Sequence, residues 1–196
     1  MKNLCIALLL VTTTLSFAQK AKPKAATSSA LATFENLKAE IITEGGKQKL
    51  AIIIDNAGKK ENVILKDLTT KDKAQQPTNF KIKSFTVSGV KLYHFSYTEN
   101  IITETKLKKE NALITSNEIW DLSATKLKIL GNIQTVTNIK EIKKLGKSEA
   151  TETVEKTRRE GFEFVLTKDF EVLLSTKTQT NKYKFNATTR RYDPKK

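Results

Sequence analysis

The hexapeptide at positions 92–97 holds the sequence's only histidine among three aromatic residues. On an extended strand, Tyr93, Phe95 and Tyr97 would share one face, with His94 on the other. A lone histidine can act as a general base. A Ser-His-acid triad, however, also needs a serine and a carboxylate from elsewhere in the fold, and no nucleophile-elbow motif marks that serine. We therefore expect a half-buried structural histidine, and a hydrolase using His94 is the weaker alternative.

The aromatic row and one arginine are the other candidates for ligand contact. Aromatic faces can stack on sugars or bases, helped by Trp120 if the fold brings it near, although packing in a β-sheet core is their more ordinary use. In the expected last hairpin Arg191 faces outward opposite Asn186, either as a recognition patch or as solvated cross-strand pairing. The candidate ligand-binding residues are Tyr93, His94, Phe95, Tyr97, Trp120 and Arg191.

No other pattern in the sequence indicates catalytic, metal or cofactor chemistry. The seven glycines make no dinucleotide-binding or P-loop spacing. A single histidine cannot supply several ligands to zinc, and the only cysteine, Cys5, lies in the N-terminal leader. Glu163 and Glu171 are expected on an outward, solvated face rather than as a tuned acid and base. We predict no catalytic residue, no metal ligand and no cofactor.

The N-terminus has the pattern of an export signal. Lys2 precedes an apolar run at residues 4–11 and a small-residue exit at 16–18, which resembles a bacterial secretory signal peptide cut after Ala18. The apolar run is much shorter than the roughly 20 residues that span a bilayer, which favours a removed signal over a membrane anchor. No second apolar run of that length follows, so we expect no transmembrane segment in the mature chain. We predict a signal peptide at 1–18, a flexible spacer rich in Lys, Ala, Ser and Thr at 19–33, and a secreted or periplasmic product.

The chain is strongly basic, with a formal net charge of +14. Removal of the leader takes away Lys2 alone and leaves +13. Such an excess favours acidic partners such as nucleic acid or acidic polysaccharide. Only four of the basic residues are arginines, however, and scattered lysines more often serve solubility and edge protection.

Alternation of apolar and polar residues predicts antiparallel hairpins at both ends of the chain. A Gly45-Gly46 turn would pair Ile41 with Leu50 and Leu37 with Ile54, and a next strand would bring Val63 opposite Ile54. Near the C-terminus the same parity test pairs Leu174 with Tyr183 and Phe185 with Tyr192. A slip of one residue would turn these side chains outward, so the agreement favours meanders with one buried face.

The middle of the chain is less regular. Strands are expected at 80–87 and 90–98, with a bulge near Ser84 because the apolar residues change face there. A further hairpin covers 101–107 and 112–120. Short helices are possible interpretations at 29–36 and 139–145, and residues 148–160 fit either a solvated helix or a polar loop.

We predict a mainly β domain over 34–196, with antiparallel meanders forming a sandwich or partly closed barrel and at most short helices. Whether two small sheets divide near 100–125 stays open. The favoured function is an exported, non-enzymatic binding or interaction protein of the bacterial cell envelope, its partner an unknown protein, glycan or apolar ligand. The alternative is a polyanion binder that uses its basic surface.

Overall fold

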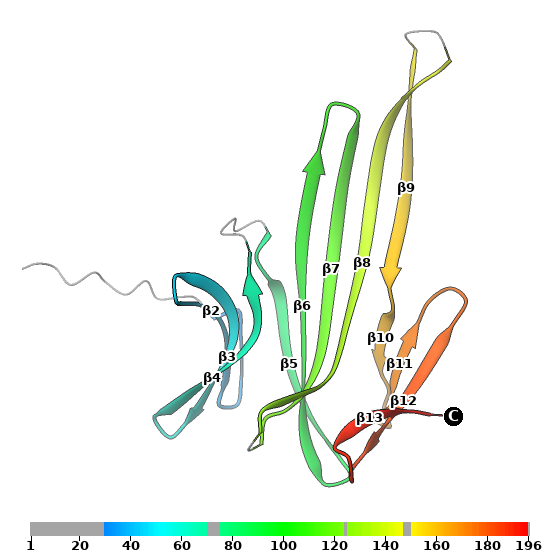
Figure 1. The fold of residues 1–196 in the computed structure, drawn as a ribbon. Coiled ribbons are helices and arrows are strands. Elements are labelled where there is room, and N and C mark those ends of the chain that lie inside the picture. The colour runs from blue at the N-terminus through cyan, green and yellow to red at the C-terminus, as the bar shows by residue number, and fades with distance from the viewer. Residues whose placement is uncertain (1–29, 70–74, 124, 147–149, 196) are drawn as a thin grey trace, which may run out of the picture.

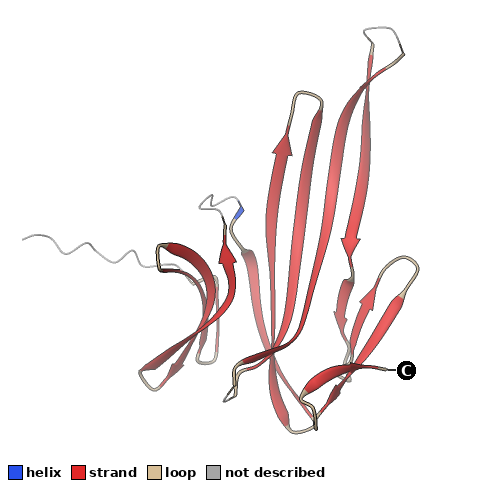
Figure 2. Ribbon diagram, in the orientation of Figure 1, coloured by secondary structure: helices blue, strands red, loops and turns tan. Residues whose placement is uncertain are grey.

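The computed structural model describes residues 30–69, 75–123, 125–146 and 150–195. Over these ranges the chain forms thirteen strands and no α-helix, arranged as three antiparallel sheets (Figures 1 and 2). None of the sheets closes into a barrel, so the mainly β, sandwich-like prediction is confirmed. No helix in the described ranges is long and apolar enough to cross a membrane.

Each sheet is a meander of strands consecutive in sequence. The N-terminal sheet contains β1 (Ala32–Phe34), β2 (Leu37–Glu44), β3 (Lys47–Asn56) and β4 (Lys59–Leu68). The central sheet contains β5 (Thr78–Val87), β6 (Val90–Glu104), β7 (Lys108–Asp121), β8 (Leu127–Lys144) and β9 (Thr151–Gly161). The C-terminal sheet contains β10 (Glu163–Leu166), β11 (Val172–Ser175), β12 (Thr180–Asn186) and β13 (Arg191–Pro194).

The two faces of the central sheet are covered by different sheets. We call face A the side that carries Phe95 and Trp120, and face B the side that carries His94 and Ile119, as the strand register assigns them. Face A packs on the N-terminal sheet through a core of buried residues: Leu37, Ala39, Leu50, Ile52, Ile54, Val63, Leu65, Phe80, Ile82, Phe95, Tyr97 and Trp120. Face B packs on the C-terminal sheet through a second core: Phe85, Leu92, Ile119, Val172, Phe185 and Tyr192. One end of the central sheet is therefore the middle layer of three.

The prediction of a bulge near Ser84 is wrong, and the three-layer arrangement explains why. Phe80 and Ile82 enter the core on face A, whereas Phe85 enters the core on face B. Strand β5 thus contributes to the core on face A at Phe80 and Ile82 and to the core on face B at Phe85, and it pairs regularly with β6 at Ser84. Its register shift lies earlier, between Thr78 and Lys81. Apolar residues on both faces indicated a second covering layer and not a kink.

The three proposed helical segments are wrong where the structure describes them. Residues 32–34 form β1, and residues 139–144 lie in β8. Residues 151–160, for which the sequence allowed either a helix or a polar loop, lie in β9. Positions 29, 148 and 149 lie outside the described residues. Strand β9 pairs with β8 from Thr151 to Gly161, and this long ladder of hydrogen bonds overrides a sequence whose charge order also suits a helix.

The predicted hairpin registers are partly right. Ile41 faces Leu50, Leu37 faces Ile54, and Phe185 faces Tyr192, as expected. Val63 instead faces Ile52, and Tyr183 faces Val172, each two residues from its predicted partner. A shift of two keeps every side chain on its face, so the buried faces are correct although the turn lengths are not.

The divisions between sheets fall between β4 and β5 and between β9 and β10. Residues 100–125 belong to β6, β7 and the turn that follows, and both strands pair inside the central sheet. The sheets therefore do not divide near 100–125.

Candidate binding surface on the central sheet

Three of the predicted aromatic contacts are core residues. Phe95, Tyr97 and Trp120 are only 0%, 2% and 7% exposed, beneath the N-terminal sheet. Tyr97 stacks on Phe80 with ring centroids 5.4 Å apart, and the Trp120 indole donates a hydrogen bond of 2.7 Å to Glu118. The fold does bring these rings together, but for packing rather than for stacking on a ligand.

Tyr93 lies on the same face at the rim of a cavity of about 640 Å³, where the ends of the three sheets meet. The Lys91 ammonium lies 5.3 Å from the Tyr93 ring centroid and 2.7 Å from Glu35. In the same cavity Arg190, from the turn between β12 and β13, forms an ion pair with Asp121. Each of these two cations already has a carboxylate partner, so the cavity is a junction between sheets.

Sequence reasoning missed the Asp121–Arg190 pair and selected the neighbouring Arg191. Arg191 is exposed at the start of β13, opposite Asn186 as expected, and makes no ion pair with any described residue. The only available signal was the position of Arg190 in the turn of a predicted hairpin. That position does not reveal which carboxylate of a distant strand lies beneath it.

His94 lies on face B and has a structural environment. Its Nε2 is 3.0 Å from the Asn117 side-chain oxygen, and its ring stacks on Phe164 of β10 at 5.0 Å. Burial lowers the pKa of the imidazole below its usual value; the bond to Asn117 opposes this shift, and nearby Lys83 adds to it. These contacts are an amide and a phenyl ring and include no nucleophile or carboxylate, so the geometry does not favour a triad.

Beyond the covered end, the central sheet continues as a single layer. The upper parts of β6–β9 extend past both neighbouring sheets (Figure 1). We call residues 98–104, 108–116, 133–144 and 151–161 the projecting sheet. At its lower end Glu99 still pairs with Lys66 of β4, and Gln134, Arg159 and Gly161 face the β11–β12 turn across a cleft. Ile101 and Ile133 on face A are 38% and 63% exposed, and Ile102 and Leu113 on face B are 50% and 45% exposed. Large apolar side chains are therefore exposed on both faces, although Ser116, Thr137 and Ile139 of face A are buried.

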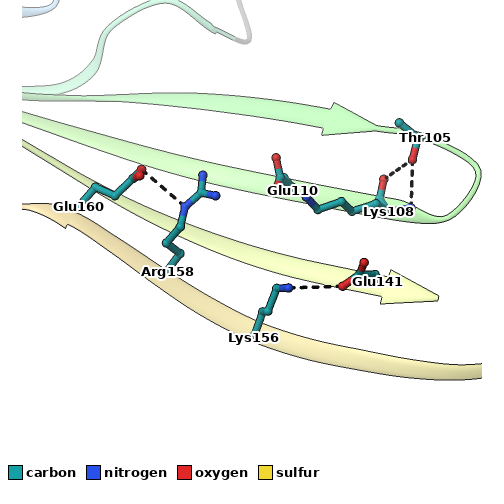
Figure 3. A network of polar contacts seen from close by, with 7 residues as sticks. All are labelled: Thr105, Lys108, Glu110, Glu141, Lys156, Arg158 and Glu160. Atoms are coloured by element: carbon teal, nitrogen blue, oxygen red, sulfur yellow. Dashed lines mark hydrogen bonds and ion pairs between the residues drawn. The ribbon is translucent and has the colours of Figure 1, made fainter. Parts of the chain in front are cut away.

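On face A the charges of the central sheet largely neutralise one another. Ion pairs join Lys108 to Glu110 at 2.7 Å, Lys156 to Glu141 at 3.3 Å and Arg158 to Glu160 at 3.6 Å (Figure 3). Strands β5–β9 place six cations and six carboxylates on this face by their register. Five of the cations are in ion pairs, and they are Lys91, Lys108, Lys128, Lys156 and Arg158.

Face B carries as many cations but fewer carboxylates. The register places six cations there: Lys81, Lys83, Lys109, Lys140, Lys144 and Arg159. Its three carboxylates are Glu104, Asp121 and Glu155, of which Asp121 is taken by Arg190. Of these six cations, only Lys109 and Lys140 form ion pairs with described residues: Lys109 pairs with Glu104, and Lys140 pairs with Glu155. The other four cations of face B therefore have no carboxylate partner among the described residues.

Amide and hydroxyl side chains lie between these cations. Cross-strand rows of face B read Ser96, Asn117, Asn132; Thr98, Thr115, Gln134; and Ile102, Asn111, Asn138, Thr157. Asn100 lies between the last two rows, and its Oδ1 is buried without a hydrogen-bond partner. Face B is thus rich in hydrogen-bonding groups with an excess of positive charge.

The described residues contain no group of three or more His, Cys, Asp or Glu side chains placed to hold a metal ion. Comparison with known proteins gives no family assignment: no family model, no curated protein and no solved structure matches this chain.

Proposed function

We propose that the chain is an exported, non-enzymatic binding protein of the bacterial cell envelope, and that face B of the central sheet binds an acidic polymer. The supporting observation is the difference between the two faces. Each has six cations, but face A pairs five of them and face B pairs two. Unpaired cations can gain an anionic partner without first losing one.

The shape of face B suits an extended ligand. The projecting sheet is four strands wide, and above the β11–β12 turn no other sheet covers its face B, so a chain lying across the strands meets successive rows of side chains. Lys81 and Lys83 lie on β5 opposite Ser96 and His94, just below the projecting sheet, and Arg159 lies on its β9 edge. Binding through such separated cations is electrostatic and depends on ionic strength.

The export part of the proposal is supported by the N-terminal pattern alone. Lys2, the apolar run at 4–11 and the small residues at 16–18 lie outside the described residues. Their order is that of a signal peptide, and an exported protein would meet acidic polysaccharides at the cell surface.

The test compares two charge reversals of equal size. Lys81→Glu with Lys83→Glu changes face B, and Lys47→Glu with Lys60→Glu changes exposed lysines of the N-terminal sheet that form no ion pair with described residues. Affinity for heparin, a highly sulfated polysaccharide, would be measured by titration at two salt concentrations. We expect the face B variant to bind at least tenfold more weakly and to have a shallower salt dependence, and the control to change by less than about threefold.

Equal weakening by both variants would contradict the proposal, because binding would then follow net charge and not face B. Tight binding that is insensitive to salt would also contradict it.

A further inference from the structure

A cleft of about 810 Å³ opens on face B where the C-terminal sheet begins. One wall is the β8–β9 edge of the central sheet, and the other is the turn between β11 and β12. The volume lies in the range of small-molecule sites, roughly 300–1,000 Å³. The lining residues are Gln134, Thr157, Arg159, Gly161, Glu163, Ser175, Thr176, Lys177 and Thr178.

The cleft depends on the backbone at Gly161, where β9 ends. Gly161 has φ +78°, and a Cβ atom there would lie 2.2 Å from the carbonyl oxygen of Ile133. Only glycine fits this close approach without a shift of the backbone. The chain here leaves the central sheet, and the strands that follow bring the β11–β12 turn over face B.

Two hydroxyl groups of the cleft, those of Ser175 and Thr176, retain hydrogen atoms to donate, whereas the Thr157 hydroxyl donates its hydrogen to the Asn138 side-chain oxygen at 3.0 Å. The Ser175 Oγ accepts a bond of 3.2 Å from the Thr180 hydroxyl. The Thr176 Oγ1 accepts bonds from two backbone N–H groups, those of Thr178 at 3.3 Å and Gln179 at 3.2 Å. Since these oxygens act as acceptors, their own hydrogens remain for a ligand.

The charged groups of the cleft favour a ligand that carries both a carboxylate and hydroxyl groups. Arg159 and Lys177 make no ion pair with any described residue, and Glu163 is the single carboxylate of the lining. A guanidinium presents a planar pair of donors that matches a carboxylate. Glu163 can accept hydrogen bonds from hydroxyl groups, which sugars supply in number.

We propose that this cleft binds a carboxylate-bearing sugar residue of an acidic polysaccharide, with Arg159 on the carboxylate and Ser175, Thr176 and Glu163 on ring hydroxyls. The inference rests on the proposed function and names its ligand class. Nucleic acid fits the cleft less well, because single strands are held largely by stacking of bases on aromatic rings. No aromatic residue lines the cleft.

The test uses three probes on the purified protein: tetragalacturonate, a neutral tetrasaccharide and oligothymidylate, each titrated by calorimetry. The variants are Arg159→Gln and Lys177→Gln, with Lys143→Gln as matched control, since Lys143 is an exposed cation of face A, outside the cleft, that forms no ion pair with described residues. We expect Arg159→Gln to weaken tetragalacturonate binding about tenfold and Lys177→Gln several-fold, with less than a twofold change for Lys143→Gln. The neutral sugar should bind at least tenfold more weakly than the acid.

Unchanged tetragalacturonate binding in Arg159→Gln would overturn the inference, as would tighter binding of oligothymidylate than of the acidic sugar. If the Lys81→Glu, Lys83→Glu variant then still loses heparin binding, the proposed function stands and only the cleft is wrong. If neither site affects binding, both proposals fail. An unchanged circular dichroism spectrum and thermal midpoint would show that Arg159→Gln, an exposed position, remains folded.

Discussion

The ion pair between Arg190 and Asp121 should be a main connection between the C-terminal sheet and the central sheet. Arg190 comes from the β12–β13 turn and Asp121 from the end of β7. The arginine also donates to the Ser123 hydroxyl at 3.2 Å, and Asp121 accepts the Ser123 backbone N–H at 3.0 Å. We expect Arg190→Gln to destabilise the protein, because it leaves a buried carboxylate without its cation.

The magnitude follows from the exposure of the two side chains, which is 47% for Arg190 and 3% for Asp121. Removing one partner of a fully buried pair costs roughly 3–5 kcal/mol, and exposed pairs contribute about 1 kcal/mol or less. With one partner buried and the other half solvated, the expected loss in free energy of unfolding is about 2 kcal/mol. For a chain of this length, that loss lowers the thermal midpoint by roughly 4–8 °C.

The assay is urea and thermal unfolding followed by circular dichroism, with Arg191→Gln as the matched control. Arg191 is the next residue, is exposed and forms no ion pair with described residues, so its change should stay within about 0.5 kcal/mol. A double-mutant cycle with Asp121→Asn would measure the coupling between the two partners. Equal stability of Arg190→Gln and Arg191→Gln would refute the reasoning, because the buried carboxylate would then not depend on its cation.

Three further predictions concern single residues. Gly161→Ala should lower the free energy of unfolding by at least about 2 kcal/mol, since it adds a backbone clash to a positive φ. The control is Gly131→Ala, whose added Cβ would meet only the Lys128 side chain, at 3.7 Å. Its free energy of unfolding, measured by the same urea assay, should change little. Because burial lowers the pKa of His94, its contribution to stability is complete above about pH 6.5 and is lost as the pH falls towards the folded-state pKa. Unfolding measured from about pH 7.5 to 5.5 should show this loss in the native protein and not in His94→Gln, and identical pH profiles would contradict the assignment. Burial raises the pKa of Tyr97 to about 12, so absorbance titration of the folded protein should find the phenol still protonated at about pH 11, and ionisation near pH 10 would show that the ring is accessible.

Much of the fold was predictable because alternation with period two determines which residues face inward. The pairs Ile41 with Leu50 and Phe185 with Tyr192 follow from that rule and from short turns. Turn lengths were harder to predict. The two-residue turn at Ala57-Gly58 places Val63 opposite Ile52, because both turn residues adopt positive φ, of 53° and 93°.

Strand β9 was missed for a different physical reason. Its residues are charged or polar at most positions because both of its faces are exposed, so the apolar alternation that identifies half-buried strands is absent. Its glutamates precede its arginines, an order that also suits a helix dipole. Pairing with β8 decides the outcome, and that pairing is a long-range property which local sequence does not encode.

The candidate site was predictable only in part. The sequence identified the aromatic row, but it could not say that a separate sheet covers Phe95 and Tyr97 while leaving Tyr93 at a cavity rim. The distribution of charge was also hidden, because Lys81 and Arg159 are almost eighty positions apart and share face B only through the register of five strands. Net charge indicated acidic partners without indicating a surface.

The change in thickness along the central sheet links the fold to the proposed function. At one end both faces are buried against other sheets, and this end supplies the stability of the domain through its two cores. The projecting sheet adds exposed strands held mainly by backbone pairing and by ion pairs of modest value. Above the lower end of this single layer, neither face packs against another sheet. The two faces can therefore differ in charge without burying a charged group in a hydrophobic core. Five of the six face A cations are in ion pairs with carboxylates of the protein, which leaves face B as the surface where cations remain for a ligand.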